Sequence, residues 1–429
     1  MSDTPTGDTP TRGTPPRGTP PRGIPAGGTA PGGTGRAGWH RRAGLLPVGY
    51  LVALAGVALV HPFLPPWRWL AIHLLLLGAV TNAILIWSAH FTTAVLRAPA
   101  PEHRRGEAAR LVLLNAGVAG VLAGGGTDRP AVGVAGAALV FAAVVAHLLW
   151  LAARLRAALP ARFAITVHYY VAAAGALLAG VPVGAWMLVA DDDSRPRLLL
   201  FHAHVNLLGW VTLTVLGTLL TLWPTILRTR MADGAPAAAR RALPVAVSGL
   251  ALLGAGVLAW WPVAGAAGVA LVAVAAGLIA RPAVRAARHK APASFAGWSI
   301  AAAGGWLLVA LGLDAWTLLA APDADTAAGR FGVVLVPLLA GFVAQTLLGA
   351  MAYLLPVALG GGPAAVRDRA GRLDRSWAQR VAMANGALAV LVLPAPPYVR
   401  ITTSLLILAA LVQFLIPAVR ILIAARRQP

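Results

Sequence analysis

Cysteine is absent from the 429 residues of this chain. Without thiols the chain can form no disulfide, no thiolate metal site, no iron–sulfur cluster and no covalently attached c-type haem. Any metal that it binds must therefore be held by histidine, methionine or oxygen ligands.

Charged residues are also scarce, at 11% of the chain against 58% hydrophobic residues. Apolar runs of about 20 residues, enough for a membrane-spanning helix, recur at close spacing. The sequence therefore predicts an all-α fold, a polytopic membrane helix bundle of about 12 transmembrane helices. The predicted spans are residues 45–64, 68–91, 109–126, 131–152, 163–190, 198–224, 243–261, 263–280, 296–319, 331–357, 379–397 and 400–424.

Acidic residues number only 14 against 35 lysines and arginines, which gives a formal net charge of +21. Such an excess can indicate a nucleic-acid partner. Here, however, the arginines gather in alternate loops, and residues 191–193 in an intervening loop are all aspartate. This alternation is typical of membrane topology, so we expect no nucleic acid and a multi-pass plasma-membrane protein with both termini in the cytoplasm.

The first residues differ in composition from the rest of the chain. Residues 1–38 are rich in proline, glycine and threonine and should be disordered, because they cannot bury apolar surface. The first apolar run begins only at Leu45, so no cleavable signal peptide is expected. We therefore predict a cytoplasmic tail of residues 1–38 and a membrane domain of residues 39–429.

Ten histidines are distributed along the chain. His40, His103 and His289 fall in arginine-rich segments and should add to the positive inner face, and His61 should lie at the outer interface. The remaining six lie in or at the ends of predicted spans, where a histidine is a functional-site candidate. Depth sorts them into an outer set and an inner set: His73, His202 and His204, and His90, His147 and His168.

His73 and His204 each lie about six residues, or roughly 9 Å, inside a span that starts outside. Two imidazoles at one depth on different helices are suited to the axial ligation of a b-type haem, and copper is a second candidate. His202 and His204 point about 200° apart around their helix, so they cannot both bind one iron. The inner set is a weaker metal candidate, since intramembrane histidines also serve as hydrogen bonds between helices.

Amides lie close to these histidines in the sequence. Asn206, Asn82 and Gln345 could hydrogen-bond the free nitrogen of a ligating imidazole, or could equally be contacts between helices.

A weak internal repeat connects spans four apart. Aligning the second span with the sixth so that His73 falls on His204 also places Gly78 on Gly209. Aligning the sixth span with the tenth places Gly209, Gly217 and Pro224 on Gly341, Gly349 and Pro356. From these two repeat alignments, the bundle is expected to consist of three quasi-equivalent four-helix units.

The run His202–Ala203–His204–Val205–Asn206–Leu207–Leu208–Gly209–Trp210, continuing to Gly217 and Pro224, resembles the His-x-His helix of haem–copper oxidase subunit I. The likeness is closest to the cbb3 and nitric oxide reductase branch of that family, and the chain also resembles NnrS-type membrane proteins. The resemblance implies that His202 and His204 are haem ligands and that His73 is the distant partner. The chain departs from the family because its His-x-His helix is the sixth span, and because it lacks the histidine pair of the oxidase copper centre.

These observations favour a membrane protein that binds haem, and copper as a further candidate, in respiratory electron transfer or nitric oxide-related metabolism. Quinone or an extracytoplasmic redox protein would be its electron partner. Whether it is an enzyme stays open, since the oxidase copper-site histidines are incomplete. The alternatives are a transporter or facilitator of a small solute, and a structural subunit without a cofactor. Coupled carriers usually place carboxylates near the midplane, whereas here Asp314 is near the outer end of the ninth span.

Overall fold

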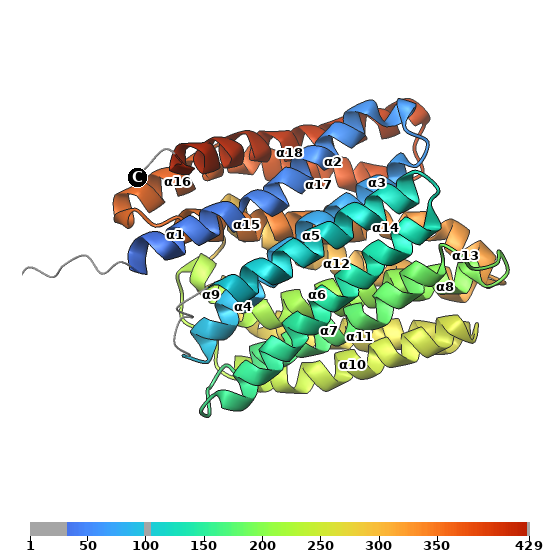
Figure 1. The fold of residues 1–429 in the computed structure, drawn as a ribbon, viewed down its shortest axis with the longest axis horizontal. Coiled ribbons are helices and arrows are strands. Elements are labelled where there is room, and N and C mark those ends of the chain that lie inside the picture. The colour runs from blue at the N-terminus through green and yellow to red at the C-terminus, as the bar shows by residue number, and fades with distance from the viewer. Residues whose placement is uncertain (1–31, 98–103, 427–429) are drawn as a thin grey trace, which may run out of the picture.

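The computed structural model describes residues 32–97 and 104–426, and within these residues it contains helices and no strand. Eleven of the described helices are long and apolar enough to cross a membrane. The predicted span 379–397 corresponds to a twelfth, shorter helix, α17 (Trp377–Val392). The all-α polytopic bundle is thus confirmed, and the chain is a multi-pass membrane protein (Figure 1).

The helices follow the predicted spans in order, and most are longer than predicted, the eighth span (Pro262–His289 against 263–280) by the most. The first third of the chain forms α1 (Gly32–Ala43), α2 (Leu45–Val60), η1 (His61–Phe63), α3 (Trp67–His73), η2 (Leu74–Val80), α4 (Thr81–Val95), α5 (Arg105–Gly126) and α6 (Pro130–Ala157). The middle third forms α7 (Ile165–Trp186), α8 (Arg195–His204), η3 (Val205–Leu213), α9 (Thr214–Leu227), α10 (Ala235–Leu258) and α11 (Pro262–His289). The last third forms α12 (Phe295–Ala320), α13 (Ala324–Arg330), α14 (Gly332–Val336), η4 (Pro337–Ala344), α15 (Gln345–Ala358), α16 (Gly362–Asp374), α17 and α18 (Pro397–Arg426).

Three spans occupy the centre of the bundle. The most hydrophobic 18-residue window of the span Trp67–Val95 is 61% buried, that of Arg195–Leu227 is 72% buried and that of Ala324–Ala358 is 56% buried. The corresponding windows of the other spans are at most 50% buried. The second, sixth and tenth spans are therefore the inner helices, and the rest surround them.

Each central span contains a π-helical segment, and the three segments follow the predicted repeat. These are η2, η3 and η4, which start at Leu74, Val205 and Pro337, positions that fall on one another in the two repeat alignments. A π turn frees a backbone carbonyl, and threonines satisfy two of them: Thr81 Oγ1 donates to Leu76 O at 2.9 Å and Thr212 Oγ1 to Leu207 O at 2.8 Å. Since π-helices are rare and frequent at functional sites, their repetition identifies three related units.

The inner ends of the three central spans repeat as well. Arg97, Arg228 and Gly360 are equivalent in the same two alignments, and all three have positive φ, at 53°, 52° and 66°. Positive φ is a usual way for a helix to end, because it lets the following amides reach the last carbonyls. The three-unit arrangement is thus present in the backbone as well as in the few sequence identities.

Amide clusters in two units join the π-helical span to its neighbours. In the first unit, Asn115 Oδ1 accepts from Tyr50 Oη at 2.8 Å and Asn115 Nδ2 donates to Asn82 Oδ1 at 2.8 Å. In the third, Asn385 Oδ1 accepts from Trp306 Nε1 at 2.7 Å and from Gln345 Nε2 at 3.0 Å. The middle unit has no amide at these positions of its sequence.

The ends of the chain extend beyond the described residues. The predicted disordered tail of residues 1–38 lies mostly outside them, and α1 begins at Gly32, within its last part. The start of α1 and the end of α18 lie at the same end of the bundle (Figure 1).

Candidate functional site

The organising element of the site is the sixth span, in which α8 passes directly into η3 at His204. Pro196 in the first turn of α8 is favourable there, because the first amides of a helix have no partner. Trp210 Nε1 donates to Thr81 Oγ1 at 3.1 Å, which fixes the sixth span against the second. This contact holds together the two spans that carry His73, His202 and His204.

His204 pairs with a carboxylate from the ninth span. Its Nε2 lies 2.9 Å and 3.0 Å from the two carboxylate oxygens of Asp314, and its Nδ1 lies 2.6 Å from Leu200 O. Both residues are 1% exposed. The ring of Phe331 lies 5.0 Å from the imidazole, centroid to centroid.

This geometry fixes the number of protons that the pair of His204 and Asp314 holds. A backbone carbonyl and a carboxylate are both acceptors, so the pair needs a proton on Nδ1 and another between Nε2 and Asp314. Either an imidazolium faces a carboxylate, or a neutral imidazole faces a carboxylic acid. In both cases the Nε2 lone pair of His204 is not available to a metal while Asp314 stays in place.

His202 lies on the opposite side of the sixth span from His204 and packs against α7. Its Nδ1 lies 2.9 Å from Gly180 O, and a methyl group at Gly184 would lie 2.5 Å from its Cε1. The backbone of α7 can approach the ring this closely only because Gly180 and Gly184 carry no side chain. The hydrogen bond to Gly180 O makes Nδ1 the protonated nitrogen and leaves the lone pair on Nε2.

Asn206 is one turn after His202 and touches its ring. Asn206 Nδ2 lies 3.2 Å from His202 Nε2 and 3.3 Å from Nδ1. A nitrogen nearly equally distant from both ring nitrogens is not in line with the Nε2 lone pair, which points away from Nδ1. The amide therefore restrains the ring without blocking Nε2.

His73 has the same arrangement of nitrogens as His202. Its Nδ1 lies 2.8 Å from Trp69 O in its own helix, and its ring stacks on the Trp69 indole with centroids 4.1 Å apart. The indole is itself packed against Gly125 of α5.

The outer histidines thus divide differently from the sequence expectation. His73 and His202 each have Nδ1 on a backbone carbonyl, while His204 joins Asp314 on another helix. Two imidazoles with available Nε2 atoms fit the axial ligation of a haem, which needs no third protein ligand. A metal ion bound by protein side chains alone fits less well, since no group of three or more histidines, aspartates or glutamates gathers among the described residues.

The inner histidines do not form a site together. His147 Nε2 lies 2.9 Å from Ser88 Oγ on α4, which is the hydrogen bond between helices that was the alternative for this residue. His168 is exposed, and its Nδ1 contacts Ala164 O of its own helix at 3.0 Å. His90 packs at ring distance from His40, Trp87 and Phe91.

The histidines that were predicted to lie at the surface differ in their exposure. His61 and His289 are exposed, as expected, and His103 lies outside the described residues. The prediction for His40 was wrong. It is 2% exposed and stacks on Trp87 at 5.5 Å, because α1 packs against the bundle.

Asn82 and Gln345 serve as the contacts between helices that were their second interpretation. Their side chains bond to Asn115 and Asn385 in place of a histidine nitrogen. Sequence reasoning attached no role to Asn115 or Asn385.

Asp314 is the residue that sequence reasoning missed. It is the one acidic residue inside the predicted spans, and that isolation in an apolar helix was the available signal. Its position close to the outer end of its span entered the sequence analysis only as an argument against coupled transport. The structure buries it almost completely against His204.

Comparison with family models and curated proteins identifies no relative of this chain. No family model matches the chain, and no curated protein is significantly similar to it.

Proposed function

We propose that this protein binds a b-type haem between His73 and His202 and acts in electron transfer or in nitric oxide-related metabolism. The observation that carries the proposal is that these two histidines, from two central spans, each have Nδ1 held by a backbone carbonyl. That hydrogen bond selects the tautomer in which Nε2 can bind iron. The resemblance of the sixth span to the His-x-His helix of haem–copper oxidase subunit I supports His202 and His73 as ligands, and the proposal departs from it at His204.

In this proposal His204 is a positioning residue. It lies two residues from His202 and is tied to α12 through Asp314, so it restrains the helix that carries the ligand. The haem would supply one-electron redox chemistry, and the apolar helices would exclude water from it. Copper is a second candidate for the same two nitrogens, since imidazole suits both metals.

The surroundings suggest partners and orientation. Arginine-rich loops favour a plasma-membrane location with both termini in the cytoplasm. The two histidines then lie near the outer face, where an extracytoplasmic redox protein could exchange electrons with the haem. Quinone from the bilayer is the other candidate donor.

The test is the reduced-minus-oxidised visible spectrum of the purified protein after expression with a haem supply. We expect a Soret shift and a sharp alpha band that are lost in His73→Ala and in His202→Ala. His204→Ala should keep the band, because its nitrogens face Asp314 and Leu200. A colourless wild-type protein would contradict haem binding, and a band lost only in His204→Ala would show that the ligand is the wrong histidine.

A second candidate function is proton-coupled transport of a small solute. The buried His204–Asp314 pair favours it, because one ionisable proton lies between two groups on different helices. The measurement is solute-driven pH change inside proteoliposomes containing the wild type or Asp314→Asn. Proton movement that the variant lacks, in a protein without haem, would favour transport over electron transfer.

A further inference from the structure

A narrow cavity runs along the centre of the bundle, inward of the three π-helical segments. Its volume is about 90 Å³, and eighteen of its nineteen lining residues come from the three central spans, six from each. Those six positions are the same in every unit under the two repeat alignments. Val80, Val211 and Val343 ring the outer end of the cavity, and Phe91, Leu222 and Leu354 ring the inner end.

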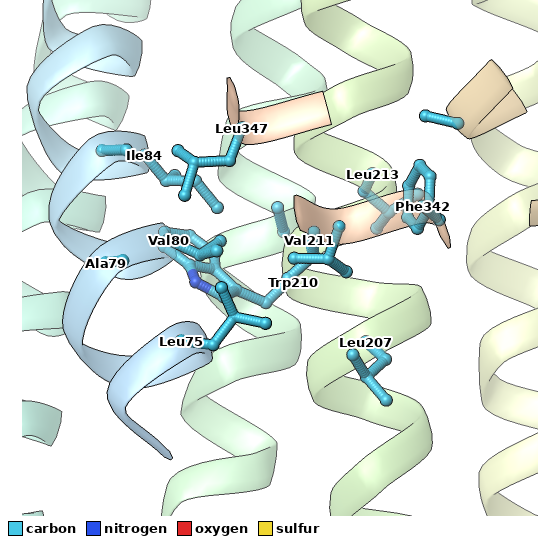
Figure 2. Close-up of a cluster of buried hydrophobic side chains, with 14 of the residues drawn as sticks. Leu75, Ala79, Val80, Ile84, Leu207, Trp210, Val211, Leu213, Phe342 and Leu347 are labelled. Atoms are coloured by element: carbon cyan, nitrogen blue, oxygen red, sulfur yellow. The ribbon is translucent and has the colours of Figure 1, made fainter. Parts of the chain in front are cut away.

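The cavity is long compared with its volume. The two rings are eleven residues apart on each helix, which is about 16 Å at 1.5 Å per residue. A dry cavity of about 150 Å³ accommodates a benzene ring, so the 90 Å³ distributed over this length is too narrow for a ring. Figure 2 shows apolar side chains of the three spans converging here, with Ile84, Val211 and Leu347 among them.

The lining excludes water and ions as natural occupants. The hydroxyls of Thr214 and Thr218 donate hydrogen bonds to backbone carbonyls at 2.7 Å, and the Ser88 hydroxyl is hydrogen-bonded to His147. Within the described part of the chain, Thr346 Oγ1 is the lining hydroxyl without a partner. A file of waters needs two to four polar partners for each molecule, which these walls do not provide.

Positive charge lies beyond the inner end of the cavity. Arg97 and Arg228 follow the inner ring by six residues, or about 9 Å, on two of the three spans. Both side chains are exposed. An anionic head group placed there would let a chain extend along the axis toward the π-helical segments.

We propose that this cavity binds the unbranched acyl chain of an anionic lipid, with its head group at Arg97 and Arg228. The narrow section favours an unbranched chain over an isoprenoid, whose methyl branches require more width. The site is independent of haem binding, because none of its lining residues is a histidine.

The experiment uses the full-length protein in nanodiscs and palmitic acid with a mid-chain diazirine. After illumination, peptide mapping should find label on α4, α9 and α15 at lining residues. Ala350→Phe, which places a ring in the cavity, should abolish this labelling. Ala142→Phe, at an exposed position of α6, is the matched control and should leave labelling unchanged.

Ala83→Leu fills the cavity from a different span and covers the case in which Ala350→Phe fails to fold, as judged by monodisperse elution. Unlabelled palmitate should compete with the probe, and an isoprenoid quinone should not. Arg97→Gln combined with Arg228→Gln should reduce labelling by the acid but not by the corresponding diazirine alcohol. Label spread over lipid-facing helices and unaffected by both filling variants would overturn the site, and competition by quinone alone would overturn the choice of chain.

Discussion

His73 and His204 occupy equivalent positions, one residue before a π-helical segment, yet their surroundings differ. His73 bonds within its own helix and stacks on Trp69, whereas His204 is locked to Asp314 on α12. The third unit has Val336 at this position. A repeated backbone therefore fixes where a side chain lies, and the neighbouring helix decides its chemistry.

The largest expected effect comes from breaking the His204–Asp314 pair. Asp314→Ala should lower the free energy of unfolding by about 3–5 kcal/mol if the pair is ionic, since removing one partner of a buried ion pair leaves the other without compensation. His73→Ala, at the equivalent position, should cost about 1 kcal/mol or less, because its hydrogen bond stays within its own helix. Thermal unfolding in detergent measures both.

The control for that comparison is the double variant His204→Leu with Asp314→Leu. It should recover most of the loss, because an apolar pair of similar volume leaves no buried charge. Equal costs for Asp314→Ala and His73→Ala, or simple additivity in the double variant, would contradict the difference between the two positions.

Substitution of the glycines at the close helix contacts should have a similar effect in each unit. Gly209→Ala would place a methyl group 2.4 Å from Ala176 Cβ, and Gly78→Ala one 2.4 Å from the Tyr50 ring. Each should destabilise the protein by about 1–3 kcal/mol through overpacking. Gly277→Ala, with no neighbouring atom within 4 Å, should be neutral or stabilising by the same unfolding measurement. A neutral Gly209→Ala would mean that the close approach is not required.

The amide clusters are a second difference between the units, because the middle unit has none. Asn115→Leu should cost about 1–2 kcal/mol, because hydrogen bonds to Tyr50 and Asn82 are lost inside the bundle. In the middle unit Leu250 of α10 lies beside Gly209 of the sixth span. Leu250→Asn alone should destabilise the protein, and adding Leu213→Asn should relieve part of the loss. No recovery in the pair would show that the units differ in more than their side chains.

The smallest effect concerns two loops. Asp191 accepts from Ser194 N and Asp323 from Thr326 N, each at 2.8 Å, and the two aspartates are equivalent in the second repeat alignment. These hydrogen bonds lower the pKa of both carboxyls. Because the folded-state pKa is below the unfolded value, their contribution is present at neutral pH and is lost as the pH falls through the folded-state pKa. Asp323→Ala should therefore lower the melting temperature slightly at neutral pH and not in strong acid, and a pH-independent difference would rule out the carboxylate as its cause.

The fold was largely predictable from the sequence. Apolar run length and alternating arginines predicted the number and order of the spans, with ends that differ by up to nine residues, because a bilayer requires each crossing helix to be long and apolar. A handful of glycines and one histidine predicted the threefold repeat, since close helix contacts and π turns recur at fixed separations. The haem assignment itself stays a prediction.

The partners of each polar side chain were decided only by the tertiary structure. Periodicity places His202 and His204 on opposite sides of one helix but does not say which neighbour each side meets. The packing of α7 and α12 around the sixth span gave His202 to Gly180 and His204 to Asp314. The sequence determined the helices, their depth and their repeat, because these depend on one segment at a time. The chemistry of each histidine depended on residues of other helices, which only packing brings together.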